Sequence, residues 1–196
     1  MPAIRTFNPL IMKNSIFTII LALTCISSYR HWGVAQREGL RIVIIRHAEK
    51  SDADNGLSCK GFNRARLLSA VLYKKFGTPD KIYVPAIGAG KRPKHVRMLQ
   101  TITPFATKYH IKINSQYNED DDEHLAGALI HERGLIIVAW EHNTIPPIVY
   151  QLVPAAKNLH WRDNDYDSIW IISFKSGKPA LSFDAEHINP GDNCNL

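Results

Sequence analysis

The chain has 196 residues, of which 45% are hydrophobic and 21% are charged. This size is typical of one domain, with room for a segment that is cleaved off. The composition excludes a wholly disordered chain. The formal net charge of +6 suits an anionic substrate, but it gives no indication of a nucleic-acid partner.

The N-terminal segment is typical of a secretory signal peptide. Arg5 and Lys13 precede an apolar stretch at 16–28, and small residues follow it. This stretch is short for the ~20 residues that span a bilayer. An uncleaved N-terminal anchor and a buried N-terminal helix are the alternatives. We therefore expect a signal peptide or anchor at 1–35 and a folded domain at 36–196. The protein would be exported to a periplasmic or extracellular location, and it would touch a membrane only if the segment stays uncleaved.

Strand-like and helix-like patterns alternate along the rest of the chain, which predicts an α/β domain with a mainly parallel sheet. Apolar, β-branched runs predict strands at 40–46, 81–87, 110–114 and 134–140. Apolar residues at helical spacing predict helices at 60–76, 94–109, 119–130 and 143–153. Two apolar runs around "KSGKP" predict a hairpin from 168 onward, which places one antiparallel strand at an edge of the sheet. With helices on both faces, the fold would be a three-layer sandwich.

The chain has three cysteines, Cys25, Cys59 and Cys194. Removal of the N-terminal segment would leave Cys59 and Cys194, and an oxidising compartment would allow these two to pair. Two separate thiols are the alternative.

Two of the apolar strands end in unusual polar pairs. Arg46 and His47 follow the first predicted strand, and Glu141 and His142 follow the fourth. In open α/β sheets the ligand crevice lies outside the carboxyl ends of the strands. If the two strands are neighbours, both imidazoles therefore reach one pocket.

These residue types suit a phosphate group better than a metal ion. Imidazole is a common metal ligand, but neither histidine has a partner at metal-ligand spacing, and the adjacent arginine would repel a dication. A guanidinium instead offers paired donors to phosphate oxygens and stays charged. A further basic cluster lies just before or within the first turn of the second predicted helix, whose N-terminus also favours anions. Its members are Lys91, Arg92, Lys94 and Arg97, of which the first three are equally compatible with a plain surface loop.

Four ordered motifs resemble those of the histidine phosphatase superfamily. "IIRHAEK" at 44–50 is similar to its Arg-His-Gly or Arg-His-Ala signature, and "LSCKGFNRA" at 57–65 resembles the start of its next helix. "RMLQTITPFA" at 97–106 resembles its Arg-x-x-Gln-Thr segment. "VAWEHNTIPPI" at 138–148 resembles the second-histidine segment of a small bacterial branch with a Trp-x-His-x-x-Ile-Pro motif. The resemblance implies a phosphoglycerate-mutase-like fold and a histidine-phosphatase-like catalytic domain.

The resemblance also implies a role for each matching residue. His47 matches the nucleophile that becomes phosphohistidine, which splits one transfer into two steps. Other matching residues clamp the phosphoryl oxygens and stabilise their charge; these are Arg46, Arg97 and His142. Lys50 and Glu141 are expected to contact the substrate, and Glu49 is expected to orient its neighbours.

The proton donor to the leaving group is open at this stage. By its order in the chain, Glu119 falls where the mutase branch places its glutamate, and it is the first candidate. The alternatives are Asp120, Asp121, Asp122 and Glu141. An acid can also be absent, as in small protein-phosphohistidine phosphatases.

Two positions depart from the family pattern. Ser51 and Asn55 lie near the offsets at which the mutase branch has a serine and an asparagine, but they do not keep the spacing. Asn143 follows the second histidine, where the phytase-like branch has an aspartate, so the chain is not of that type.

The remaining charged residues are expected to be structural or solvated. Arg64 and Arg66 should face solvent, with a secondary phosphate role as the alternative. The other histidines, expected to be structural or on the surface, are His31, His95, His110, His124, His131, His160 and His187.

The sequence therefore favours an exported, metal-independent phosphatase that uses no cofactor and acts on a phosphorylated small molecule or a phosphoprotein. The bond cleaved would be a phosphomonoester or a phosphohistidine. A catalytically weak or inactive phosphate-binding or phosphoprotein-binding module of the same fold is the alternative. A phosphomutase is the third hypothesis.

Overall fold

The computed structural model describes residues 39–90 and 94–194. The predicted signal peptide or anchor at 1–35 lies outside these residues, as do Lys91 and Arg92 of the basic cluster. Within the described ranges, no helix is both long enough and apolar enough to cross a bilayer.

A six-stranded mixed sheet forms the centre of the domain, in the order β3-β2-β4-β1-β5-β6. Its strands are β1 (Arg41–Arg46), β2 (Lys81–Tyr83), β3 (Ile113–Asn114), β4 (Leu135–Trp140), β5 (Ser168–Lys175) and β6 (Lys178–Ala185). The first four are joined by parallel pairings, whereas β5 runs antiparallel to β1 and β6 returns beside β5. The α/β class with a mainly parallel sheet is confirmed. The strand that opposes the others is β5, one position inside the edge strand β6.

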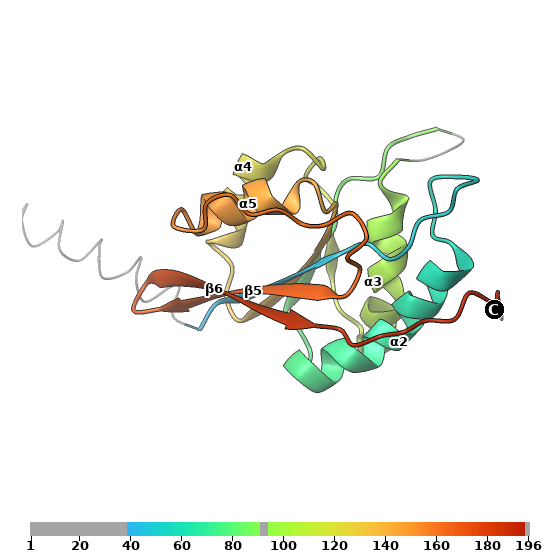
Figure 1. Ribbon diagram of the computed structural model, residues 1–196. Coiled ribbons are helices and arrows are strands. Elements are labelled where there is room, and N and C mark those ends of the chain that lie inside the picture. Colours follow the sequence, from blue (N-terminus) through green and yellow to red (C-terminus); the bar gives the residue numbers. More distant parts are fainter. Residues whose placement is uncertain (1–38, 91–93, 195–196) are drawn as a thin grey trace, which may run out of the picture.

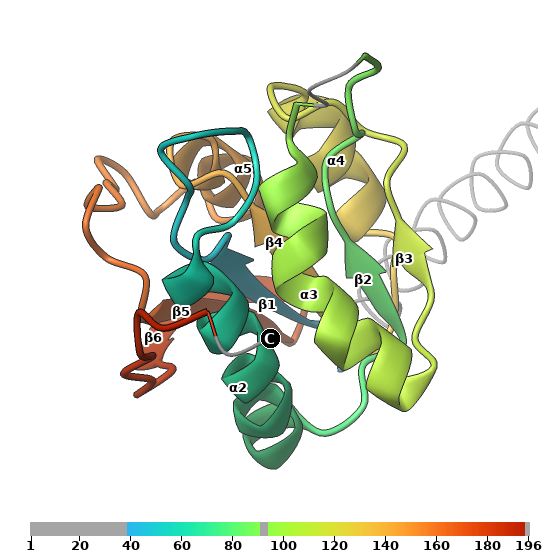
Figure 2. The same cartoon turned by 90° about the vertical axis from the view of Figure 1, so that its right-hand side faces the viewer.

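Helices cover both faces of this sheet (Figures 1 and 2). On one face lie α2 (Cys59–Phe76) and α3 (Val96–Tyr109), and on the other lie α4 (Asp122–Leu129) and α5 (Ile145–Leu152). The three-layer arrangement is therefore as predicted.

Alternate side chains of β1 enter two separate cores. Val43 and Ile45 pack with α2 and α3, whereas Ile42 and Ile44 pack with α4 and α5. All four are fully buried, and each contributes roughly 1.5–3 kcal/mol relative to an exposed side chain. Burial on both faces explains why the strand is a continuous apolar run without alternation.

Two predicted strands are shorter in the structure. β2 ends at Tyr83, although the backbone N–H groups of Val84 and Ala86 still donate to Asn114 and Tyr117. Pro85 lies between them and has no N–H to continue the ladder. β3 covers only Ile113–Asn114.

The C-terminal segment lies along α2 (Figure 2). A disulfide joins Cys59, the first residue of α2, to Cys194, so the structure favours the paired state over two separate thiols. The side-chain amide of Asn63 also donates to the carbonyls of Gly191 and Asn193. These contacts attach the end of the chain to the helix that follows the predicted nucleophile.

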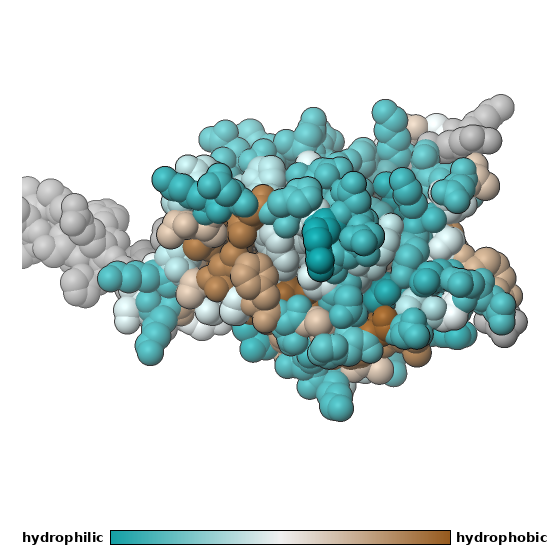
Figure 3. Space-filling view, in the orientation of Figure 1, coloured by the Kyte–Doolittle hydropathy of each residue, from teal (hydrophilic) through white to brown (hydrophobic). Residues whose placement is uncertain are grey.

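The face of the domain shown in Figure 3 is mostly hydrophilic, with apolar residues gathered near β5 and β6. Phe183 of β6 is 61% exposed and packs edge-on against Trp170 of β5. Single exposed aromatic side chains of this kind are common on folded proteins.

Candidate active site

The two strands that carry the histidines are hydrogen-bonded neighbours. Arg46 of β1 is in register with Trp140 of β4, and the backbone N–H of His47 donates to the Trp140 carbonyl at 3.1 Å. Both strands therefore deliver their last residues to the same carboxyl edge of the sheet. The ring centroids of His47 and His142 lie 6.3 Å apart, so the predicted convergence is observed.

A cleft of about 530 Å³ opens at this edge. All the residues predicted for the site line it: Arg46, His47, Lys50, Arg97, Glu119, Glu141 and His142. The lining also includes Asn143, Asp163 and Tyr166, of which the last two had no sequence signal.

The imidazole of His47 has a defined orientation. The side chain is 2% exposed, and its Nδ1 lies 2.6 Å from the carbonyl oxygen of Ala48. A carbonyl oxygen only accepts, so Nδ1 carries a proton and Nε2 is left for chemistry. The Ala48 N–H donates in turn to Oγ1 of Thr101 at 2.8 Å. Thr101 of the third motif thus positions the peptide that orients His47, the predicted nucleophile.

The start of α2 is packed against the chain just beyond His47. A Cβ atom at Gly61 would lie 2.2 Å from the Glu49 carbonyl oxygen, so only glycine fits there. Ser58 caps the helix by accepting the Gly61 N–H at 3.1 Å. The second motif therefore contains the glycine that allows α2 to pack closely against the segment that follows β1.

Arg64 is buried, and the prediction that it faces solvent is wrong. Its Nε lies 3.1 and 3.0 Å from the two carboxylate oxygens of Glu49, and its Nη1 donates to Glu186 at 2.8 Å. Glu186 lies 122 positions away in sequence, so helix periodicity gave no sign of it. Arg66 is exposed, as expected.

Burial raises the pKa of Glu186 to about 8, although Arg64 opposes the shift. The nearby carboxylates of Asp167 and Glu49 add to the shift. The contacts of Glu49 fit its predicted orienting role, because its carboxylate pairs with Arg64 and its carbonyl accepts the backbone N–H of Ser58 at the start of α2.

Arg46 is held by the main chain of the loop before β5. It is 3% exposed, and its Nη1 lies 2.9–3.2 Å from the carbonyl oxygens of Arg162, Asp163 and Asp165. Its guanidinium carbon lies 4.0 Å from the centroid of the Tyr166 ring. Burial lowers the pKa of Arg46, with Tyr166 and nearby acids opposing, but a guanidinium remains charged in proteins.

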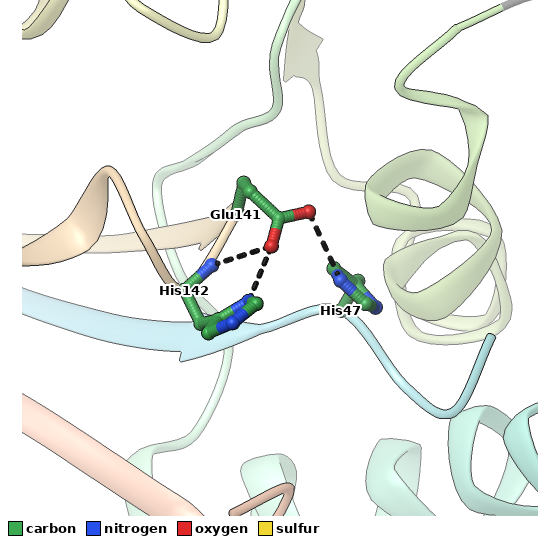
Figure 4. Close-up of side chains that lie close together, drawn as sticks. All are labelled: His47, Glu141 and His142. Carbon is green, nitrogen blue, oxygen red and sulfur yellow. Dashed lines mark hydrogen bonds and ion pairs between the residues drawn. The ribbon is translucent and has the colours of Figure 1, made fainter. Parts of the chain in front are cut away.

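Glu141 lines the cleft and contacts both His47 and His142 (Figure 4). Its Oε2 lies 3.1 Å from Nε2 of His47 and 3.3 Å from Nη2 of Arg97. Its Oε1 accepts the backbone N–H of His142 at 3.2 Å and also contacts that residue's Nδ1. Burial alone would raise the pKa of Glu141, but the His47 imidazole, His142 and Arg97 lower it to about 2. The ionised carboxylate of Glu141 therefore lies among the imidazole and guanidinium groups that would otherwise contact a bound anion.

Glu119, the first candidate for the proton donor, lies against His95. Its Oε2 is 2.5 Å from Nδ1 of His95. Burial raises the pKa of Glu119; Glu141 and Asp120 add to the shift, while His95 and Arg97 oppose it. A raised pKa suits a general acid. His95 has a positive φ of 61° just before α3, and no pattern in the sequence connected it with Glu119.

The similarity of this chain to known proteins is found among solved structures. No protein-family model matches the chain, and neither does any curated protein. A SixA protein of Agrobacterium tumefaciens is 16% identical to it, with a TM-score of 0.54 over 75% of this chain and 99% of the other. A protein histidine phosphatase SixA complexed with tungstate is 14% identical, with a TM-score of 0.56 over 74% and 97%. A phosphoserine phosphatase variant of Entamoeba histolytica in complex with phosphoserine is 15% identical, with a TM-score of 0.50 over 75% and 98%.

The chain has the fold of the histidine phosphatase superfamily. This confirms the phosphoglycerate-mutase-like fold that the four motifs predict. At these identities the likeness establishes the fold of this histidine-phosphatase-like domain, and its chemistry rests on the residues of the cleft.

Three side chains of this histidine-phosphatase-like domain could in principle share a cation. Ligand atoms of His47, Glu141 and His142 all lie within 4.8 Å of one another. However, Nη2 of Arg46 lies 3.1 Å from Nδ1 of His142, and Arg97 contacts Glu141. Two guanidinium groups at this distance would repel a dication. The donor set therefore fits a phosphoryl group better than a metal ion.

Proposed function

We propose that this protein is a phosphatase that hydrolyses a phosphomonoester or a phosphohistidine through a phosphohistidine on His47. The observation that carries the proposal is the placement of Nε2 of His47 among buried cationic donors. Arg46 and Arg97 flank the cleft, and the Nε atom of each is buried with no hydrogen-bond partner within the described residues. Buried donors without partners are costly, and an oxyanion would satisfy them.

The geometry supports a two-step mechanism. In the first step, Nε2 of His47 attacks phosphorus while the leaving oxygen departs, and Nδ1 keeps its bond to the Ala48 carbonyl as the ring gains charge. Charge develops on the phosphoryl oxygens, where Arg46, Arg97 and His142 donate. In the second step, water attacks the phosphohistidine and releases phosphate. No step requires a metal, so we propose metal-independent hydrolysis.

The cleft and the matched proteins support a proposal for the substrate class. The matches include proteins named for phosphohistidine and phosphoserine. Lys50 is exposed at the edge of the cleft, where it would meet the part of a substrate beyond its phosphoryl group. We therefore propose a phosphorylated small molecule or a phosphoprotein as substrate, with no nucleic-acid partner.

We also propose that the domain at 36–196 works outside the cytoplasm after removal or anchoring of residues 1–35. The disulfide between Cys59 and Cys194 supports this location, because structural disulfides persist in oxidising compartments.

The alternative is a phosphate-binding module with weak or no turnover. One observation favours it. The carboxylate of Glu141 lies 3.1 Å from Nε2 of His47 and so blocks the nitrogen that would have to attack phosphorus. The two functions differ in whether His47 ever becomes phosphorylated.

The test is hydrolysis of an aryl phosphate by the full chain, with and without a chelator, followed by labelling with a phosphodonor. We expect vanadate-sensitive hydrolysis that the chelator does not reduce, and an acid-labile, base-stable label on His47. His47→Ala should abolish both. His124→Ala is the matched control, because that imidazole is on the surface with its side chain 78% exposed. Phosphate binding without any label would support the binding module instead.

A further inference from the structure

The contact between His47 and Glu141 contains a proton that the reaction must move. Nδ1 of His47 already donates to the Ala48 carbonyl. Its Nε2 lies 3.1 Å from Oε2 of Glu141, and a lone pair does not approach a carboxylate oxygen at this distance without a proton between them. The two side chains therefore share one proton on the nitrogen that has to act as nucleophile.

That proton lies where phosphorus has to arrive. The lone pair of an imidazole nitrogen points outward in the ring plane, along the direction of its hydrogen bond. A phosphorus atom must approach Nε2 along the same direction. Attack therefore requires that the proton leave His47 and that Oε2 of Glu141 move aside.

Glu141 also occupies donors that the phosphoryl oxygens would use. Its Oε2 accepts a hydrogen bond from Nη2 of Arg97 at 3.3 Å, and its Oε1 accepts one from the backbone N–H of His142 at 3.2 Å. An arriving phosphoryl dianion competes for these groups and repels a carboxylate beside it. Like charges in one site favour protonation of one of them. Entry of the phosphoryl group thus drives the shared proton onto Glu141.

We propose that Glu141 is the proton carrier of this active site, resting in the phosphoryl position and collecting the proton that His47 must lose. This rests on the proposed phosphatase function. In the first step, the Nε2–H bond of His47 breaks and its proton bonds to Oε2 of Glu141. Nε2 then bonds to phosphorus, the bond from phosphorus to the leaving oxygen breaks, and Glu141 donates its proton to that oxygen.

The second step reverses the roles. The carboxylate of Glu141 accepts a proton from the attacking water, whose oxygen bonds to phosphorus as the bond to Nε2 breaks. The proton then returns to Nε2 of His47 when phosphate leaves. Charges and atoms balance over the cycle without an additional reactant. Glu119 lines the same cleft, and in this scheme it contacts the substrate without carrying the proton.

A series of leaving groups tests the proposal on the full chain. Nitrophenyl phosphate releases a weakly basic oxygen that departs without a proton, whereas an alkyl phosphate needs one. In Glu141→Gln, we expect the single-turnover rate of His47 phosphorylation by the alkyl phosphate to fall by about 10²–10⁴, the range for loss of a general acid, and the same rate for nitrophenyl phosphate to fall less than about tenfold. The second step is common to both substrates, so a slower second step should lower kcat for both alike. His47 should still accept the label from nitrophenyl phosphate.

Two further variants keep the test decisive. Glu141→Asp retains a carboxyl group and should recover part of the alkyl-phosphate activity, which a purely structural role for Glu141 does not predict. Glu119→Gln should change both substrates by a similar factor. If Glu119→Gln alone shows the selective loss of alkyl-phosphate hydrolysis, Glu119 is the acid and the proposal is overturned. Absence of any label on wild-type His47 would instead overturn the phosphatase function itself.

Discussion

The guanidinium of Arg46 stacks on the ring of Tyr166, with 4.0 Å between the guanidinium carbon and the ring centroid. The same ring lies 6.3 Å from that of His47. Tyr166 thus contacts both His47, the predicted nucleophile, and Arg46 of the predicted phosphoryl clamp. It comes from the loop before β5, whose carbonyl groups also accept from Arg46.

This stacking predicts different effects for two substitutions at Tyr166. Tyr166→Phe keeps the aromatic face and should retain kcat/KM within about threefold, because a cation–π contact depends on the ring. Tyr166→Ala removes the ring and should lower kcat/KM by about tenfold, which corresponds to the ~1–2 kcal/mol of a partly desolvated contact. Steady-state hydrolysis of nitrophenyl phosphate measures both. Equal losses in the two variants would show that the hydroxyl, and not the ring, matters.

Arg46 itself should not tolerate lysine. The guanidinium reaches three carbonyl groups through Nη1 while Nη2 contacts His142, and an ammonium group cannot reproduce this fork. We expect Arg46→Lys to lower kcat/KM by about 10²–10³, as for loss of an oxyanion donor. Lys50→Arg, at the exposed edge of the cleft, is the comparison and should have a small effect. A wild-type inhibition constant for vanadate in Arg46→Lys would contradict the clamp role.

The buried carboxyl of Glu186 should make the stability of the protein depend on pH. Its folded pKa of about 8 exceeds the value of about 4.3 in an unfolded chain. Between these values the folded state binds more protons than the unfolded state, so the free energy of unfolding falls as pH rises. Glu186→Gln keeps an acceptor for Arg64 but does not titrate.

We therefore expect the free energy of unfolding of the wild type to fall relative to that of Glu186→Gln as pH rises from about 4.5 to about 8. Urea unfolding at several pH values, followed by circular dichroism, measures this difference. Two curves that stay parallel over the whole range would show that Glu186 is ionised in the folded state.

Removal of the disulfide should destabilise the domain. Cys59 and Cys194 close a loop with a sequence separation of 135, and loops of this length constrain the unfolded chain strongly. We expect reduction to lower the free energy of unfolding by about 2–5 kcal/mol. The double variant Cys59→Ser/Cys194→Ser should unfold like the reduced wild type and should not respond to reductant. A wild type that is equally stable with and without reductant would contradict the prediction.

The sequence alone was sufficient for the order of the elements and for the chemistry of the two strand ends. Continuous apolar runs predicted strands that are buried on both faces. The structure agrees, since both faces of β1 and β4 contact helices. Polar pairs at the ends of such strands predicted a ligand site, because the ligand crevice of an open α/β sheet lies outside the carboxyl ends of its strands. The ordered motifs then identified the fold, which the structural matches confirm.

Tertiary structure decided which partners these residues have. Periodicity reports which face of a helix a residue occupies, but not whether a distant carboxylate meets it there. Arg64 was therefore assigned to solvent, although Glu49 and Glu186 enclose it. The contacts of His95 with Glu119 and of Tyr166 with Arg46 were missed for the same reason, because their partners are remote in sequence.

Glu141 illustrates the division most clearly. Its place beside His142 in the sequence indicated that it belongs to the site. Only the pairing of β4 with β1 determines that its carboxylate reaches Nε2 of His47, since strand register sets which side chains meet across the end of a sheet. Local sequence thus indicated the histidines, arginines and carboxylates predicted for the site. The packing of distant segments added Asp163 and Tyr166 and determined the distances between all these groups.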